Sequence, residues 1–238
     1  MIDVWSHRIV GVIGGMGPKA TLDFLSTMLR LTSSARTDQD HVPTLVYNDP
    51  RIPDRNMACS GAGPSPEPML IKIARSLESA GADCLVMPCN TAHIYASAIR
   101  RAISIPFIDM IEATCDAVTT AHSVVRAVGL LATPGCTASG LYTNALATRE
   151  IALVTLSEPA EKTLIEIIYA VKAGRSGSCE QQAARRLAME LIDRGAGAII
   201  SACTELPMVL KQADLPCPLI ESTYALAKRS ISYAKHGF

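Results

Sequence analysis

The chain has 238 residues, 49% of them hydrophobic, so it can bury a large core and does not have the composition of a disordered protein. Lysine plus arginine and aspartate plus glutamate number 22 each, and this balance provides no basic field for nucleic acid or for an anionic membrane surface. We therefore expect a small-molecule partner, with no nucleic acid and no membrane involved.

Residues 1–8 are charged and hold no apolar run long enough for a signal peptide, and the longest apolar stretches have the length of strands rather than of membrane spans. The 8 cysteines are scattered through a core-rich chain, which predicts reduced thiols in a cytoplasmic protein rather than a disulfide framework. Five of them have no polar motif around them and are interpreted as inert: Cys59, Cys84, Cys115, Cys179 and Cys217.

Strand-like apolar runs alternate with helix-like stretches along the whole chain. The runs are residues 8–13, 44–47, 84–87 and 106–108, and then 126–131, 152–156, 198–201 and 218–220. Amphipathic stretches over 69–80, 164–173 and 181–194 are each followed or ended by a glycine, which is typical of a helix C-terminus. The glycine- and proline-rich segment 60–68 is expected to be a surface loop. Continuous apolar strands between helices predict parallel sheets covered on both faces.

This order of elements occurs twice. Residues 9–13 resemble 127–131, residues 81–89 align without a gap on 195–203, and residues 105–109 align on 217–221. Three matches in the same order indicate a duplication. We therefore predict an α/β fold of two pseudo-symmetric lobes, each a mainly parallel four-stranded sheet flanked by helices, with the active site in the cleft between the lobes. Residues 1–114 and 218–238 form the expected N-terminal lobe, and residues 115–217 form the second lobe.

Cys89 and Cys203 occupy the same register of the two repeats, each just after a predicted strand. Functional groups of open parallel sheets gather beyond the C-terminal strand ends, so a pseudo-twofold axis would turn the two thiols toward each other. Removing the α-proton of an amino acid and returning it to the opposite face needs a base on one side and an acid on the other. Helix N-termini after each cysteine would stabilise a thiolate and bind the substrate α-carboxylate, with Asn90 and Thr91 capping the helix that follows Cys89.

The same residues permit other interpretations. A cysteine at a strand end is often only a tolerated small residue. Cys89 and His93 are four residues apart, but no second pair with zinc-like spacing accompanies them, so no metal is expected. His93 and Glu205 are interpreted either as polar partners of the thiols or as orienting or capping residues.

The segment Gly15-Met16-Gly17-Pro18-Lys19-Ala20 fits the dinucleotide fingerprint G-x-G-x-x-A. The acidic residue that this fold requires would fall within residues 36–40, before the strand 44–47. Pro18 is better explained as the first residue of a helix, and the glycines as the floor of a cleft that the substrate approaches. An NAD-dependent oxidoreductase is therefore not favoured.

Five motifs are spread over most of the chain: Gly14-Gly15-Met16-Gly17-Pro18, Ile52-Pro53-Asp54-Arg55, Met87-Pro88-Cys89-Asn90-Thr91-Ala92-His93, Val171-Lys172-Ala173-Gly174 and Cys203-Thr204-Glu205. Together they resemble the pyridoxal-phosphate-independent aspartate racemases of the aspartate/glutamate racemase superfamily. The resemblance implies catalytic Cys89 and Cys203, no cofactor, a homodimer, and an L- or D-amino acid substrate, aspartate first and glutamate second. It also implies that Arg55 and Lys172 fix the distal carboxylate, which a planar guanidinium recognises well. The remaining residues expected in the substrate site are Met16, Asn90, Thr91, Thr133, Thr204 and Glu205.

Alternatives stay open at this point. Arg55 is also compatible with a loop salt bridge to Asp54, and Lys172 with a solvated helix end. The chain departs from the family pattern at Ala202, where glycine is frequent, and at Cys136 and Asn56, where threonine is usual. Another superfamily enzyme (a glutamate, hydantoin or broad-specificity amino-acid racemase, a maleate isomerase or a decarboxylase) and a non-catalytic amino-acid-binding protein are the rival functions. Retention of both cysteines favours the two-base racemase.

Overall fold

The computed structural model describes residues 7–121 and 124–237. Residues 1–6, which make up most of the segment in which no signal peptide is expected, lie outside the described residues. The chain divides into two compact units, one of Met1–Ala113 with Thr223–Phe238 and the other of Thr114–Ser222. Within the described ranges, no helix has both the length and the apolar character needed to cross a membrane.

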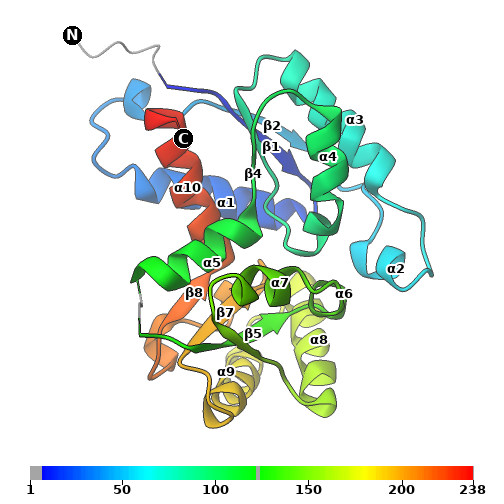
Figure 1. Ribbon diagram of the computed structural model, residues 1–238, viewed down its shortest axis with the longest axis vertical. Coiled ribbons are helices and arrows are strands. Elements are labelled where there is room, and N and C mark those ends of the chain that lie inside the picture. The colour runs from blue at the N-terminus through cyan, green and yellow to red at the C-terminus, as the bar shows by residue number, and fades with distance from the viewer. Residues whose placement is uncertain (1–6, 122–123, 238) are drawn as a thin grey trace. The chain divides into compact units, whose positions relative to one another are not determined.

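The first unit is built on a sheet of four parallel strands in the order β2-β1-β3-β4 (Figure 1). Its strands are β1 (Val10–Gly14), β2 (Thr44–Asn48), β3 (Cys84–Val86) and β4 (Phe107–Ile108). Its α-helices are α1 (Pro18–Leu31), α2 (Arg55–Cys59), α3 (Glu67–Ser79), α4 (Ala96–Ala102), α5 (Met110–Ala121), which continues into the second unit, and α10 (Ser222–His236). Short 3₁₀ helices span Asp38–Asp40 and Thr91–Tyr95.

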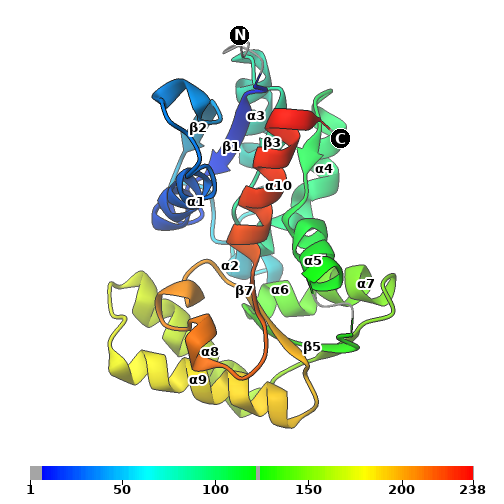
Figure 2. The ribbon, with the colours of Figure 1, turned by 90° about the vertical axis from the view of Figure 1, so that its left-hand side faces the viewer.

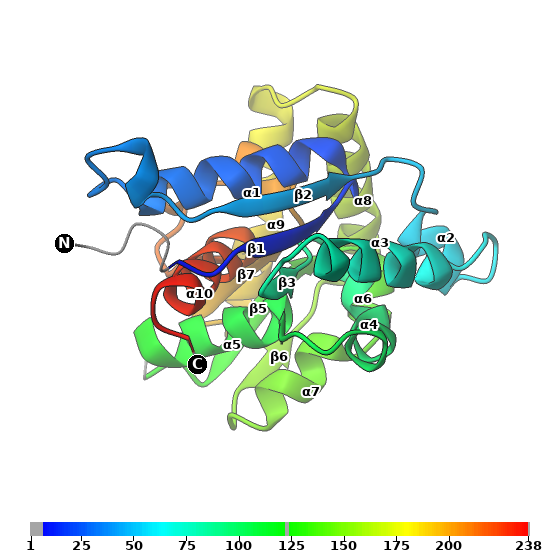
Figure 3. The same cartoon turned by 90° about the horizontal axis from the view of Figure 1, so that it is seen from above.

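Helices cover both faces of this sheet because the central strands are apolar on both sides. Val12 packs with Phe24 of α1 and Leu226 of α10 on one face, and Figures 2 and 3 show α10 and α1 along β1. Leu85 packs with Ile73 of α3 on the other face. The two buried layers explain why β1 and β3 read as continuous apolar runs in the sequence.

The second unit repeats this plan with a sheet of parallel strands in the order β6-β5-β7-β8. Its strands are β5 (Ala127–Ala132), β6 (Ala152–Val154), β7 (Ala198–Ala202) and β8 (Leu219–Glu221). Its α-helices are α6 (Pro134–Ala138), α7 (Leu141–Ala147), α8 (Glu158–Lys172) and α9 (Ser178–Asp193), and 3₁₀ helices span Leu206–Met208 and Gln212–Asp214. The adjacent helices α8 and α9 (Figure 2) bury one face, where Leu164 and Leu187 pack with Ile199.

The registers of the two sheets confirm the duplication. Val10 pairs with Cys84 in the first sheet, and the aligned residues Val128 and Ala198 pair in the second. The next interface repeats the correspondence, since Leu85 pairs with Phe107 and Ile199 pairs with Leu219. The predicted α/β fold with two parallel four-stranded sheets is therefore confirmed.

The glycines predicted to end three helices lie at the expected positions. Gly81, Gly174 and Gly195 follow α3, α8 and α9 with φ of +95°, +84° and +100°. A side chain is disfavoured in this region, so glycine ends each helix without strain. The predicted loop 60–68 is wrong at its end, because α3 already begins at Glu67 with prolines in its first turn, where a missing N–H costs nothing.

Residues 219–221 differ from the expected assignment. The sequence analysis placed residues 218–238 in the N-terminal lobe, whereas β8 pairs with β7 and the second unit extends to Ser222. In the second repeat β8 is the equivalent of β4, and it pairs with β7 in the same register in which β4 pairs with β3. It therefore belongs to the second sheet. Only α10, after this strand, packs on the first sheet.

Candidate active site

Cys89 lies beyond the C-terminal end of β3, in a tight turn of the first unit. Its side chain is buried, and its backbone N–H donates to the Met87 carbonyl at 2.8 Å. The following helix is a 3₁₀ helix, Thr91–Tyr95, rather than an α-helix. Asn90 stands at its N-cap position but has helical φ and ψ and makes no side-chain capping bond, so the predicted capping role of Asn90 is wrong. Asn90 and Thr91 are both buried.

His93, in the helix after Cys89, contacts backbone groups through both ring nitrogens. It is 2% exposed, and its Nδ1 lies 2.8 Å from the Cys89 carbonyl oxygen while its Nε2 accepts from the Met110 N–H at 3.0 Å. Burial lowers the pKa of His93, against the opposing effect of the nearby Asp109 carboxylate. The imidazole is therefore neutral and points both nitrogens at backbone groups.

Cys203 directly follows β7 in the second unit and has a different environment. Its Sγ donates to Glu205 Oε2 at 3.0 Å, and Thr204 Oγ1 donates to the same oxygen at 3.1 Å. Burial raises the pKa of Cys203 well above its ordinary value, and the negative charge of Glu205 raises it further, while the positive charge of Lys172 works in the other direction. Cys203 therefore rests as a thiol.

The glycine turn after β1 packs in the same buried cluster as Cys89. Met16 is buried in the same cluster as Ile52 and Cys89, so three of the sequence motifs meet at the carboxyl ends of neighbouring strands. Pro18 is the first residue of α1, as predicted. This convergence follows from the parallel sheet, in which all strands end at one edge.

Asp49 is a residue that the sequence reasoning missed. It follows β2 directly, where a dinucleotide-binding fold carries its acidic residue. Here Arg51 holds both carboxylate oxygens at 2.9 and 2.7 Å, and this hydrogen bonding lowers the pKa of Asp49 to about 2. Gly15, with φ of +100°, packs so closely that a Cβ would lie 2.2 Å from the Asp49 carbonyl oxygen. The backbone of Asp49 therefore lies against the glycine turn while Arg51 holds its carboxylate, and an acidic residue two positions after the strand 44–47 was the signal that could have revealed it.

Arg55 is the first residue of α2, directly after the loop that supplies Ile52 to the buried cluster. Its Nη1 donates to the Pro53 carbonyl at 3.0 Å and to the Ile52 carbonyl at 3.4 Å. Asp54 instead caps α2 by accepting from the Met57 N–H, so the alternative of an Asp54–Arg55 salt bridge is wrong. The guanidinium is held by neutral carbonyls and keeps its positive charge uncompensated by these bonds.

In the second unit Lys172 and Thr133 lie at element ends. Lys172 closes α8, with its Nζ 5.8 Å from the centre of the Tyr169 ring, and its charge acts on the Cys203 thiol. Thr133 is the N-cap of α6, is buried, and its carbonyl accepts from Thr137 Oγ1 at 3.3 Å. Two departures from the family pattern are accommodated by packing, because Cys136 and Ala202 are both buried.

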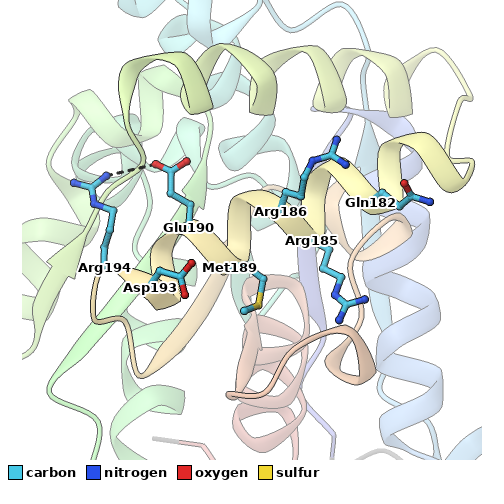
Figure 4. A pocket seen from close by; sticks show the side chains of 7 residues that line it. All are labelled: Gln182, Arg185, Arg186, Met189, Glu190, Asp193 and Arg194. Atoms are coloured by element: carbon cyan, nitrogen blue, oxygen red, sulfur yellow. Dashed lines mark ion pairs between the residues drawn. The ribbon is translucent and has the colours of Figure 1, made fainter.

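Two other kinds of site, a metal site and a surface hollow, are alternatives to this one within the described residues. No group of three or more His, Cys, Asp or Glu side chains in the described part of the chain is arranged to hold a metal ion. A hollow of about 560 Å³ lies along α9 and is lined by long charged side chains such as Arg185 and Glu190, the latter 3.6 Å from Arg194 (Figure 4). None of the residues that line it belongs to the predicted site.

Comparisons with known proteins show the family of the chain. A model of the Asp/Glu/hydantoin racemase family matches residues 13–229. The broad specificity amino-acid racemase RacX of Bacillus subtilis is 29% identical over 229 residues, which cover 94% of this chain and 97% of that protein. The structure of Picrophilus torridus aspartate racemase is 33% identical, has a TM-score of 0.84, and is matched over 95% of this chain and 94% of its own. A glutamate racemase of Deinococcus radiodurans is 25% identical over 201 residues, 84% of this chain and 62% of that protein.

Two repeated parallel sheets, each with a buried cysteine at the end of its third strand, are the architecture of a racemase-type isomerase. The chain belongs to the Asp/Glu/hydantoin racemase family and is an amino-acid racemase. The resemblance inferred from the five motifs is thereby confirmed.

Proposed function

We propose that this protein racemises an acidic amino acid by a two-base mechanism in which Cys89 and Cys203 act on opposite faces of one substrate. The observation that carries the proposal is the duplication, since the paired strand registers give the two cysteines equivalent positions beyond β3 and β7. Racemisation needs a proton-transfer group on each face of the α-carbon, and two equivalent cysteines would supply both groups. The proposed reaction uses no cofactor, because both proton-transfer groups are side chains of the chain.

In the proposed reaction one proton is removed from the α-carbon and another is delivered to it. One sulfur, as thiolate, takes the α-proton, and the other, as thiol, delivers its proton to the opposite face of the carbanion. Cys203 is suited to begin as the acid, because its Sγ–H is held by Glu205. For the reverse direction Cys203 must act as the base, and Glu205 is placed to take the thiol proton at 3.0 Å. Backbone N–H groups of the two turns would bind the α-carboxylate, which gains negative charge as the proton leaves.

The proposed substrate is aspartate first and glutamate second. Arg55 and Lys172 offer positive charge on the loop beside the Cys89 cluster and near Cys203, respectively, which would fix a distal carboxylate. A second candidate is a broad-specificity amino-acid racemase, which the similarity to RacX favours. Under that alternative the two cations would not discriminate among substrates.

The test of the mechanism replaces each cysteine in turn. Purified protein is incubated with L- or D-aspartate without added cofactor, and racemisation is followed by optical rotation and by deuterium uptake from solvent. Cys89→Ala and Cys203→Ala are each expected to lose racemisation by about 100-fold or more, while each still exchanges the α-hydrogen of one enantiomer. The control is Cys179→Ala, which removes an exposed thiol of α9. Unimpaired turnover in either active-site variant would refute the two-base assignment.

The test of the substrate class replaces Arg55 by alanine. Arg51→Ala is a matched control, since it removes the same charge from the same loop, but Arg51 is already neutralised by Asp49 at 2.7 Å. Arg55→Ala is expected to raise KM for aspartate by about tenfold or more, through loss of a charged carboxylate contact, and to leave KM for alanine nearly unchanged. Equal losses for aspartate and alanine would favour the broad-specificity alternative.

A further inference from the structure

His93 joins two parts of the first unit that are separate in the chain. A backbone carbonyl can only accept and a backbone N–H can only donate, so the Cys89 carbonyl requires a proton on Nδ1 and the Met110 N–H requires a bare Nε2. Only the neutral Nδ1–H tautomer satisfies both bonds at once. The imidazole therefore ties the turn that carries the thiol to the first residue of α5.

The Met110 end of this link is itself firmly held. Asp109 Oδ1 accepts from the Ile111 N–H at 2.8 Å, and its Oδ2 accepts from Arg100 Nη2 at 2.7 Å. His93 and Asp109 thus accept from the N–H groups of Met110 and Ile111, the first two residues of α5. The Arg100–Asp109 ion pair thus stabilises the start of α5, where the Met110 N–H donates to the His93 imidazole.

We infer that His93 is a positioning residue for the proposed reaction, which sets the direction of the Cys89 side chain by fixing the peptide plane between Cys89 and Asn90. The inference rests on the proposed function. Its direct support is geometric: the bond is made to the carbonyl of the cysteine itself, and the His93 N–H donates to the Asn90 carbonyl at 3.0 Å, so both ends of one turn are closed.

The second repeat lacks this device. The residue aligned with His93 is Pro207, four positions after Cys203, and it has no side-chain donor. Cys203 instead is tied through its sulfur to Glu205. The duplicated fold therefore orients one thiol through its backbone and the other through its side chain, and loss of His93 should affect Cys89 alone.

Two substitutions separate the two bonds of the imidazole. His93→Asn places an amide N–H near the position of Nδ1 and can keep the bond to Cys89, whereas His93→Gln places a carbonyl near the position of Nε2 and can keep the bond to Met110. If His93 positions the thiol, His93→Gln lowers kcat by about 100-fold with little change in KM, because a displacement near 1 Å has that effect, and His93→Asn retains most of kcat. Equal losses in the two variants, or a loss expressed in KM, would overturn the inference.

Alkylation by iodoacetamide, followed peptide by peptide, provides a readout independent of racemisation. His93→Gln is expected to change the rate at Cys89 by about threefold or more and to leave the rate at Cys203 unchanged, with Cys203 as the internal control. Unchanged Cys89 reactivity in His93→Gln would overturn the positioning role even if the protein proved inactive on every amino acid, an outcome that would refute only the proposed function.

A measurement on the unsubstituted protein covers the case of variants that do not fold. Nitrogen-15 spectra of the histidine side chains at about pH 7 are expected to show one imidazole locked as the neutral Nδ1–H tautomer. A His93 ring that is charged, or protonated on Nε2, cannot make the two bonds and would overturn the inference.

Discussion

The negative charge of Glu205 is predicted to control the acidity of the Cys203 thiol. Glu205→Gln keeps the shape of the side chain and an oxygen for the Sγ–H, which lies 3.0 Å from Oε2, but removes the charge. Two unit charges about 4 Å apart interact by about 4 kcal/mol at an effective dielectric constant of about 20, and about 1.4 kcal/mol corresponds to one pKa unit. Glu205 is only half-buried, so solvent screens part of this energy. The expected change is a fall of the Cys203 pKa, with about 4 kcal/mol as the upper bound on the free energy that the charge of Glu205 contributes.

The assay is the pH dependence of alkylation at Cys203, because only the thiolate reacts. The rate is measured between about pH 6 and pH 10 by quantifying the peptide that carries Cys203, and the substitution is expected to move the rising limb of the profile to lower pH. Cys89 in the same molecules is the control, and its profile should not move. A Cys203 profile that is unchanged, or that moves to higher pH, would show that Glu205 does not hold this proton, and the role given to it in the reverse reaction would fall with it.

Three further predictions concern the folded state and are measured by urea denaturation. Phe24→Ala, at a side chain with 0% exposure, is expected to lower the free energy of unfolding by about 3–5 kcal/mol, whereas Leu22→Ala, at 63% exposure, changes it by about 0.5 kcal/mol or less. Gly129→Ala places a Cβ 2.7 Å from a side-chain atom of α9 and is expected to destabilise by about 1–3 kcal/mol; Gly197→Ala, with its nearest neighbour at 3.6 Å, is the control, and similar losses would refute the packing argument. Because burial lowers the pKa of His93 below 6.5, the folded chain keeps this ring neutral while the unfolded chain takes up a proton. The free energy of unfolding should therefore fall as the pH drops below about 6.5, and it should fall less steeply in His93→Gln; parallel pH profiles would contradict this.

The repeat was the strongest information in the sequence. Paired positions such as Leu85 with Phe107 and Ile199 with Leu219 are aligned in the sequence and equivalent in the sheets, as the duplication predicts, whereas the strand order came from the structure. Residue types around Cys89 and Cys203 also pointed to the chemistry, since a strand end followed by polar residues is where parallel sheets place reacting groups.

Sequence patterns were less informative where a side chain chooses among several local partners. Asp54 was free to pair with Arg55 or to cap a helix, and the structure shows that it caps α2. Asparagine is a residue type that often caps helices, yet Asn90 has helical dihedral angles and makes no capping bond. These outcomes depend on differences of about 1 kcal/mol between neighbouring hydrogen bonds, which no spacing rule resolves.

The sequence by itself determined the two-sheet α/β plan, the equivalence of the two cysteines and the helices that end at Gly81, Gly174 and Gly195, because apolar periodicity, glycine and duplication act locally along the chain. Only the tertiary structure decided that His93 is neutral and bound between Cys89 and Met110, and that Cys203 carries its proton toward Glu205. Protonation states and hydrogen-bond partners depend on burial and on groups brought together by folding, and these are properties of the packed chain rather than of any segment of it.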